Sequence, residues 1–158
     1  RAVANQGIAA ALLGGWQLNG LVSSYSGRPF TVSADGGTLN APGNSQTADQ
    51  VNPLVQKIGS LGQFYDKSAF AAIRDARFGN TGRNILRGPG VVNLNLGLFR
   101  DFAPREHLQL QFRAEAFNAT NTPHFNNPQA NVSSATFMQI TSALTDQRTV
   151  RLGIRVVW

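Results

Sequence analysis

The sequence predicts an all-β fold: a segment of an antiparallel transmembrane β-barrel, with about four amphipathic strands and two long extracellular loops, that forms part of a larger barrel. Three observations support this prediction. Apolar and polar residues alternate in four separate segments, as they do in strands with one apolar face. One connection between these segments is short and two are very long. The charged fraction is 14%, well below the roughly 25% of an average soluble domain.

The clearest alternation lies in residues 106–118 and 148–158. Successive side chains of a strand point to opposite faces, so each segment has one apolar face and one polar face. The apolar faces hold Leu108, Leu110, Phe112, Val150, Leu152, Ile154 and Val156. The polar faces include Arg113, Glu115, Arg151 and Arg155.

The same pattern occurs in residues 91–102 and, more weakly, in residues 16–26. In the former, Leu94, Leu96 and Leu98 alternate with small or polar residues. A transmembrane barrel turns its apolar positions toward lipid and its polar positions toward the lumen. We therefore expect these three leucines and the seven apolar residues of the other two strands to face outer-membrane lipid. We expect the four charged residues of the polar faces to face the lumen.

The connections between the strands differ in length. The short one, Asp101–Arg105, contains Pro104, and proline ends strand pairing and turns the chain. The long ones, residues 27–90 and 119–147, are rich in Gly and Pro or in Asn, Ser and Thr. We expect a short helix at Asp66–Ile73 in the first, with Asp66 as its N-cap, and a short strand at Thr136–Thr141 in the second.

These lengths also predict the direction of each strand. Outer-membrane barrels have short periplasmic turns and long extracellular loops. Strands 16–26 and 106–118 would then run outward, whereas strands 91–102 and 148–158 would run inward. The residues before Trp16 would belong to a periplasmic turn, and Trp158 would lie at the periplasmic interface. Four strands cannot close a barrel. The chain, which begins with Arg1, is therefore expected to be part of a longer protein.

Composition excludes several classes of protein. The chain has no Cys, and hence no disulfide scaffold or thiol catalysis. Its net charge is +6, but the arginines are scattered, so we expect no nucleic-acid partner. Gly79–Gly90 lacks the Lys-Ser/Thr pair of a phosphate-binding loop and is interpreted as an ordinary loop. His107 and His124 lack metal-ligand spacing, and no paired carboxylates or nucleophile elbow occur. We expect no enzyme activity, no metal and no cofactor.

Five ordered blocks resemble the C-terminal end of TonB-dependent outer-membrane receptors, in particular the Oar-like group with a carboxypeptidase-regulatory-like domain. The resemblance extends from about Leu13 to Trp158. The blocks are Gly15-Trp-Gln-Leu-Asn-Gly20, Ser26-Gly-Arg-Pro-Phe30, Phe78-Gly-Asn-Thr-Gly-Arg-Asn-Ile-Leu-Arg-Gly-Pro-Gly90, Leu108-Gln-Leu-Gln-Phe-Arg-Ala-Glu-Ala-Phe-Asn118 and Asn121-Thr-Pro-His-Phe125.

The resemblance implies a location in the bacterial outer membrane and a role in nutrient uptake. Such receptors have a barrel of about 22 strands around an internal plug. An N-terminal TonB box couples them to the inner membrane. Residues 1–158 would be the C-terminal part of the barrel domain, with plug and TonB box absent from them. The implied partners are lipid, the rest of the barrel and plug, the barrel-assembly machinery, and TonB through the missing N-terminal part.

Several alternatives remain open at this point. Trp158 is interpreted as an assembly signal for the barrel-assembly machinery, or as an aromatic residue of the membrane interface. The four lumen-facing charges would contact a plug or an anionic substrate, or form a ladder of salt bridges between strands, which we favour. Alternating strands would also suit a secreted β-sandwich binding module, for example for glycans. A truncated, non-functional product is a third alternative.

Overall fold

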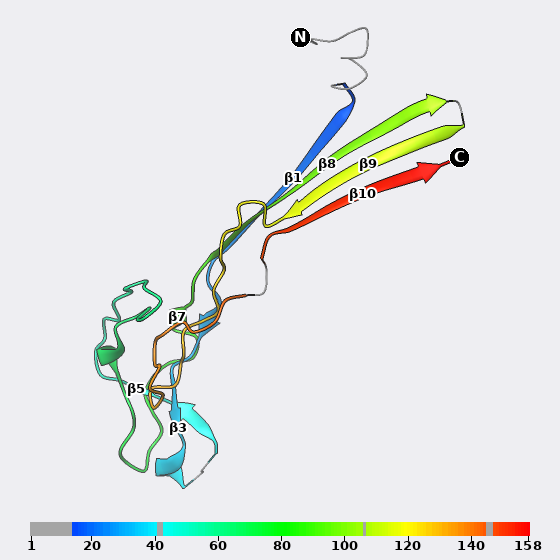
Figure 1. Ribbon diagram of the computed structural model, residues 1–158. Coiled ribbons are helices and arrows are strands. Elements are labelled where there is room, and N and C mark those ends of the chain that lie inside the picture. Colours follow the sequence, from blue (N-terminus) through cyan, green and yellow to red (C-terminus); the bar gives the residue numbers. More distant parts are fainter. Residues whose placement is uncertain (1–13, 41–42, 106, 145–146) are drawn as a thin grey trace. The chain divides into compact units, whose positions relative to one another are not determined.

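A computed structural model (Figure 1) describes residues 14–40, 43–105, 107–144 and 147–158. Contacts between residues divide the chain into two compact units. The sheet unit comprises Arg1–Ser23, Val92–Thr122 and Asp146–Trp158, and the loop unit comprises Ser24–Val91 and Pro123–Thr145. The periplasmic segment expected before Trp16 lies almost entirely outside the described residues.

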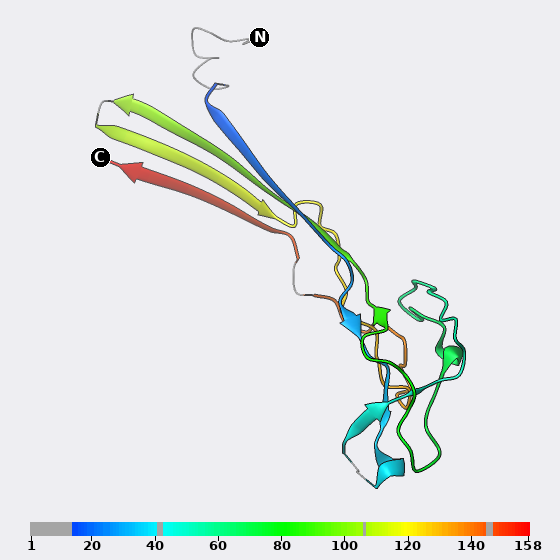
Figure 2. The ribbon, with the colours of Figure 1, turned by 180° about the vertical axis from the view of Figure 1, so that it is seen from behind.

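Four long strands form one antiparallel sheet in the order β1-β8-β9-β10. Their bounds are Trp16–Tyr25 (β1), Val91–Arg105 (β8), Leu108–Phe117 (β9) and Thr149–Val157 (β10). Neighbouring strands of this sheet run in opposite directions (Figures 1 and 2). Both long connections therefore leave the same end of the sheet, and the short β8–β9 turn lies at the other end. The described sheet is open, with β1 and β10 at its edges, as expected for part of a barrel.

The expectation that Pro104 makes the short turn was wrong, because Pro104 lies inside β8. Phe102 pairs with Leu110 and Arg105 with Leu108, so two residues of β8 oppose one residue of β9. Such a β-bulge accommodates a residue without an N–H donor while pairing continues beyond it. The strand is therefore longer than the predicted 91–102, and the chain turns after Arg105.

The register places apolar residues of neighbouring strands side by side. Ala114 of β9 lies opposite Leu98 of β8 and Leu152 of β10, and Ala116 likewise lies opposite Leu96 and Val150. The outer strand β10 is exposed along its whole length, with Leu152 73% and Ile154 72% exposed. Among the described residues, no further strand joins this sheet.

The loop unit contains three two-stranded pairs instead of featureless loops. Strand β2 (Pro29–Phe30) pairs with β7 (Leu86–Arg87), β3 (Ser33–Asp35) with β4 (Ser45–Thr47), and β5 (Asp49–Gln50) with β6 (Phe70–Ala71). Two 3-10 helices accompany them, η1 (Gly37–Leu39) and η2 (Lys67–Ala69).

Two predictions about local structure in the loops need correction. The helix expected at Asp66–Ile73 is one 3-10 turn, because the chain becomes extended at Phe70 and enters β6. Asp66 is its N-cap, and its carboxylate accepts a hydrogen bond from the Ser68 N–H at 2.9 Å. The strand expected at Thr136–Thr141 is a series of turns. Met138 adopts a left-handed φ of 62°, which is incompatible with an extended strand.

The loop unit has its own hydrophobic core. Its buried residues include Val32 and Met138, each 0% exposed, together with Phe64 and Phe70. Backbone hydrogen bonds join the two long connections: Phe64 N–H donates to the Met138 carbonyl at 2.8 Å, and Ile140 N–H to the Leu61 carbonyl at 2.8 Å. The two connections therefore fold together. No helix in the described part of the chain is long and apolar enough to cross a membrane.

Candidate functional site

A pocket of about 780 Å³ lies within the loop unit. Four segments line it: residues 25–29, 87–91, 125–127 and Leu144. The first two flank the β2–β7 pair, and the third belongs to the second long connection. Since ligand pockets of proteins usually enclose about 300–1,000 Å³, this size suits a small molecule.

Two glycines allow the chain segments beneath the pocket to approach each other closely. A Cβ atom on Gly27 would lie 1.7 Å from the Gly88 carbonyl oxygen. A Cβ atom on Gly88 would lie 2.1 Å from the Asn127 side-chain oxygen. The Gly88 N–H donates to the Arg28 carbonyl at 3.0 Å, which fixes this crossing. A side chain at Gly27 would therefore force the segments apart, and one at Gly88 would displace the Asn127 side chain, so either would change the pocket.

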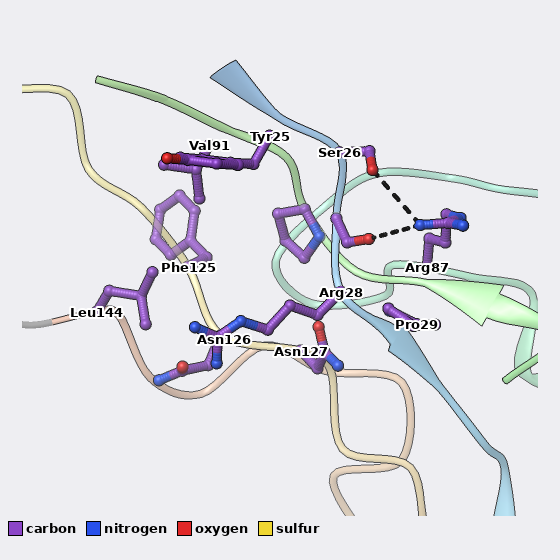
Figure 3. A pocket seen from close by; sticks show the side chains of 12 residues that line it. Tyr25, Ser26, Arg28, Pro29, Arg87, Val91, Phe125, Asn126, Asn127 and Leu144 are labelled. Carbon is purple, nitrogen blue, oxygen red and sulfur yellow. Dashed lines mark hydrogen bonds between the residues drawn. The ribbon is translucent and has the colours of Figure 1, made fainter. Parts of the chain in front are cut away.

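The lining of the pocket is apolar on one side and polar on the other (Figure 3). Tyr25 and Phe125 provide aromatic rings near Val91 and Leu144. The opposite side is polar and contains Arg28, Asn126 and Asn127. No Asp or Glu occurs among the lining residues. The pocket is therefore suited to a ligand with an apolar surface and with hydroxyl or anionic groups.

Some polar groups of the lining are occupied by contacts within the protein. Arg87 Nη1 donates to the Gly27 carbonyl at 3.3 Å and to Ser26 Oγ at 3.4 Å (Figure 3). The Asn126 amide nitrogen donates to Ser142 Oγ at 3.0 Å. These bonds hold the lining segments in place, so we assign Arg87 and the Asn126 amide nitrogen a structural role.

Other polar groups of the lining remain available. The side chains of Arg28 and Asn127 make no hydrogen bond or ion pair with any residue that the structure describes. A guanidinium donates up to five hydrogen bonds, and an amide both donates and accepts. These two side chains are therefore the groups of the pocket best placed to bind a polar ligand.

A second polar cluster in the loop unit is structural. Arg77 donates to both oxygens of Asp49, at 2.8 Å and 2.5 Å, and the Asn80 N–H donates to the same carboxylate at 3.3 Å. The hydrogen bond from Arg77 holds the pKa of Asp49 below its usual value, against the opposing effect of burial. This pair joins β5 to residues 77–80 and lies outside the pocket lining.

The predicted lipid-facing residues all occur on strands of the sheet. The strand pairing places Leu96, Leu98, Leu110 and Phe112 on one face with the apolar residues of β10. Leu94 and Leu108 continue the alternation of their own strands. Trp158 follows the end of β10 and is 91% exposed.

The expected salt-bridge ladder on the polar face was wrong. Arg151 lies opposite Glu115 in the register, yet both ion pairs that occur between described residues involve Arg77. Arg113 instead lies over the Phe99 ring at 5.7 Å, and Arg151 over the Phe117 ring at 5.1 Å. Phe99 and Phe117 share the polar face, and each offers a ring to a neighbouring cation.

Arg100 is a residue of the sheet that sequence reasoning missed. It lies opposite Phe112, on the otherwise apolar face, and is only 6% exposed. Its guanidinium carbon lies 5.3 Å from the centre of the Trp16 ring and 4.2 Å from that of Phe102. Continuing the alternation of β8 beyond Leu98 would have placed it on this face.

The remaining candidate motifs have structural explanations in the loop unit. A Cβ atom on Gly79 would lie 2.0 Å from the Thr47 carbonyl oxygen, so this glycine permits close packing. Gly79–Gly90 contains β7 and is an ordinary part of the loop unit. His124 is 2% exposed. No cluster of three or more possible metal ligands occurs within the ranges that the structure describes.

Comparison with known proteins supports the barrel interpretation. The family model described as "Outer membrane beta barrel domain" matches residues 1–151. No curated protein matches the chain, and no solved structure matches it. The secreted β-sandwich alternative was wrong, because the matched family is an outer-membrane barrel domain. The chain belongs to the outer membrane beta barrel domain family and forms part of a β-barrel in the bacterial outer membrane.

Proposed function

We propose that this chain is the C-terminal barrel portion of a TonB-dependent receptor of the Oar-like group that takes up a nutrient. The observation that carries the proposal is the loop unit. Two connections that leave one end of the sheet share a core and enclose a pocket. A receptor needs such a preformed site to collect a scarce ligand.

The two faces of the sheet have different roles in this proposal. The ten apolar residues predicted to face lipid form the outer surface of the barrel, where a bare apolar face is favourable. Arg113, Glu115, Arg151 and Arg155 face the lumen and would meet the plug or a passing substrate. The rings beside Arg113 and Arg151 would hold these cations in place until such a contact forms.

We propose that the barrel-assembly machinery recognises Trp158. Its exposed position at the end of β10 supports this role. We expect Trp158→Ala to lower the amount of folded barrel in the outer membrane severalfold, measured as heat-modifiable protein on gels. Val150→Ala, at the other end of β10 and 61% exposed, is the control. An equal loss in both variants would show that the effect is not specific to Trp158.

The receptor proposal is tested on the full-length protein. We expect photo-cross-linking in energised cells to join its N-terminal part to TonB, and a protonophore to reduce this product. Purified protein in planar bilayers should conduct no steady ion current, because a plug would close its lumen. A steady current without TonB cross-linking would identify an open diffusion channel and overturn the proposal.

A further inference from the structure

We propose that the pocket of the loop unit binds an acidic saccharide, with Arg28 pairing to its carboxylate and with Tyr25 and Phe125 contacting the apolar faces of its rings. This inference rests on the proposed uptake function, for which it names the substrate class. It is carried by the juxtaposition of an aromatic wall, a guanidinium without a partner and amide groups in one pocket (Figure 3).

The aromatic wall selects a ligand with flat apolar surfaces. Tyr25 is 66% exposed, and its ring lies on the same side of the pocket as Phe125. Sugar rings present patches of C–H groups on their faces and hydroxyls at their edges. An aromatic ring is apolar on its face, and the hydroxyl of Tyr adds a polar contact at its edge. This wall therefore suits a sugar ring better than a simple inorganic anion.

The charge of the pocket selects an anionic ligand. Arg28 has no partner among the described residues, and no carboxylate lines the pocket to neutralise it. The described part of the loop unit carries seven Lys and Arg residues against four Asp. A guanidinium can bind a carboxylate through two parallel hydrogen bonds, which gives affinity together with orientation.

The amide groups complete the recognition of a saccharide. The Asn127 side chain makes no hydrogen bond with a described residue, so both its donor and its acceptor are available. Sugar hydroxyls also donate and accept, so they can bind both ends of an amide. A pocket with only a guanidinium would accept any anion, whereas the amide and the aromatic wall together favour a hydroxylated ring.

The pocket is held in shape without a ligand. The Gly27–Gly88 crossing fixes its floor, and Arg87 ties Ser26 and Gly27 to it. Residue Phe125 forms a bridge with Ala143, which anchors the aromatic wall. A preformed site loses less conformational entropy on binding than a flexible one, so affinity does not require rearrangement of the lining.

The test is calorimetric titration of the full-length protein in detergent with three probes. These are trigalacturonic acid, the neutral sugar maltotriose and the acidic peptide triglutamate. We expect trigalacturonic acid to bind at least about tenfold more tightly than the other two, the scale of one charge-assisted pair. Equal binding of the acidic and neutral sugars would overturn the proposal. Tighter binding of triglutamate would overturn it in favour of a peptide site.

Variants identify the groups that bind. Arg28→Gln should weaken trigalacturonic acid about tenfold or more and leave maltotriose unchanged. Phe125→Ala should weaken both sugars. Arg83→Gln removes an exposed arginine of the same unit outside the pocket and should change neither. An Arg28→Gln variant that binds like the unaltered protein would overturn the assignment, provided that protease resistance shows an intact loop unit.

The two proposals fail in distinguishable ways. Cross-linking to TonB without saccharide binding would overturn the substrate class and leave the receptor proposal standing. Saccharide binding that depends on Arg28, without coupling to TonB, would overturn the receptor proposal and support the pocket assignment.

Discussion

The sheet unit and the loop unit differ in where their apolar side chains lie: those of β10 are exposed, whereas those of the loop unit form a buried core. Every residue of β10 is exposed, including Leu152 and Ile154 on its apolar face. The loop unit buries thirteen apolar residues around Val32 and Met138. The hydrophobic effect requires apolar area to leave water, and lipid serves this purpose as well as protein does. The sheet therefore depends on its surroundings for stability, whereas the loop unit carries its own core.

This contrast also separates the two kinds of function. The sheet requires only that one face be apolar, so many substitutions within that face would keep its role. The pocket depends on particular contacts, such as the Gly27–Gly88 crossing, that no other residue type allows. Changes in the loop unit should therefore alter binding, and changes in the sheet should alter insertion and stability in the membrane.

The largest expected effect comes from a substitution that destabilises the core of the loop unit and leaves the sheet unchanged. Met138→Ala should cost the loop unit about 2–5 kcal/mol, because it leaves a cavity at a fully buried position. Limited proteolysis of outer membranes should then cleave the loop unit faster, while heat modifiability of the barrel stays normal. Leu54→Ala, at a position 80% exposed, is the control and should have little effect. Parallel loss of barrel and loop unit would contradict their independence.

A second prediction tests the dependence of the sheet on lipid. Leu152→Arg should cost roughly 2–4 kcal/mol of barrel stability, the cost of an arginine on a lipid-facing strand near the midplane. Asn19→Arg places the same charge on the polar face of the opposite edge strand and should cost much less. Denaturant unfolding of the full-length protein in lipid vesicles measures both. Equal losses would show that the apolar face does not meet lipid.

A third prediction concerns pH and the loop unit. The pKa of Asp49 is lowered from its usual 3.8, chiefly by the hydrogen bond from Arg77. The ionised carboxylate therefore stabilises the fold above pH 3.8, and this contribution is lost as the pH falls below that value toward the folded-state pKa. Asp49→Asn should remove about 1 kcal/mol at neutral pH, since Arg77 is half exposed, and should flatten the acid limb of the stability profile.

The control for this prediction is Asp75→Asn. Asp75 is exposed, and its carboxylate lies 3.7 Å from the same guanidinium. Urea-dependent proteolysis between pH 3 and 7 should show little change for this variant. An Asp75 effect as large as that of Asp49 would indicate a general response to charge, rather than loss of the hydrogen-bonded pair.

The smallest expected effect concerns Arg100, a cation that lies opposite Phe112 on the apolar face. Arg100→Lys should lower barrel stability by up to about 1 kcal/mol, because an ammonium lacks the planar surface that lies over two rings. Arg113→Lys is the matched control, since Arg113 lies over one ring, and at a longer distance. A larger loss at Arg113 would contradict the contribution assigned to the Trp16 and Phe102 rings.

Much of the sheet could be predicted from sequence because its causes are local. Alternation with a period of two places residues such as Leu110 and Leu152 on one face, whatever neighbours they have. The prediction for Pro104 was wrong because a proline disrupts a strand only where its missing N–H would have made a ladder hydrogen bond. In the β-bulge between Phe102 and Arg105 that hydrogen bond is not required. The alternation of β8 also indicates the face of Arg100, but its contact with the Trp16 ring could not be predicted, because Trp16 is distant in sequence.

The pocket could not be predicted, because its parts are joined only by folding. Tyr25, Arg28 and Phe125 come from segments about a hundred residues apart that show no common pattern. The signal that could have indicated the site was the density of glycine between Gly79 and Gly90. That signal suggests close packing, but it does not name the partner segment.

The sequence by itself determined that this protein has strands with one apolar face, one short and two long connections between them, and no disulfides. These properties follow from the order of residue types along a strand and from composition. Only the tertiary structure decided that the two long connections share a core and that Arg28 faces an aromatic wall across a pocket. The reason is physical: an alternating face is a property of one strand, whereas a core and a pocket require contacts between segments whose pairing no local pattern specifies.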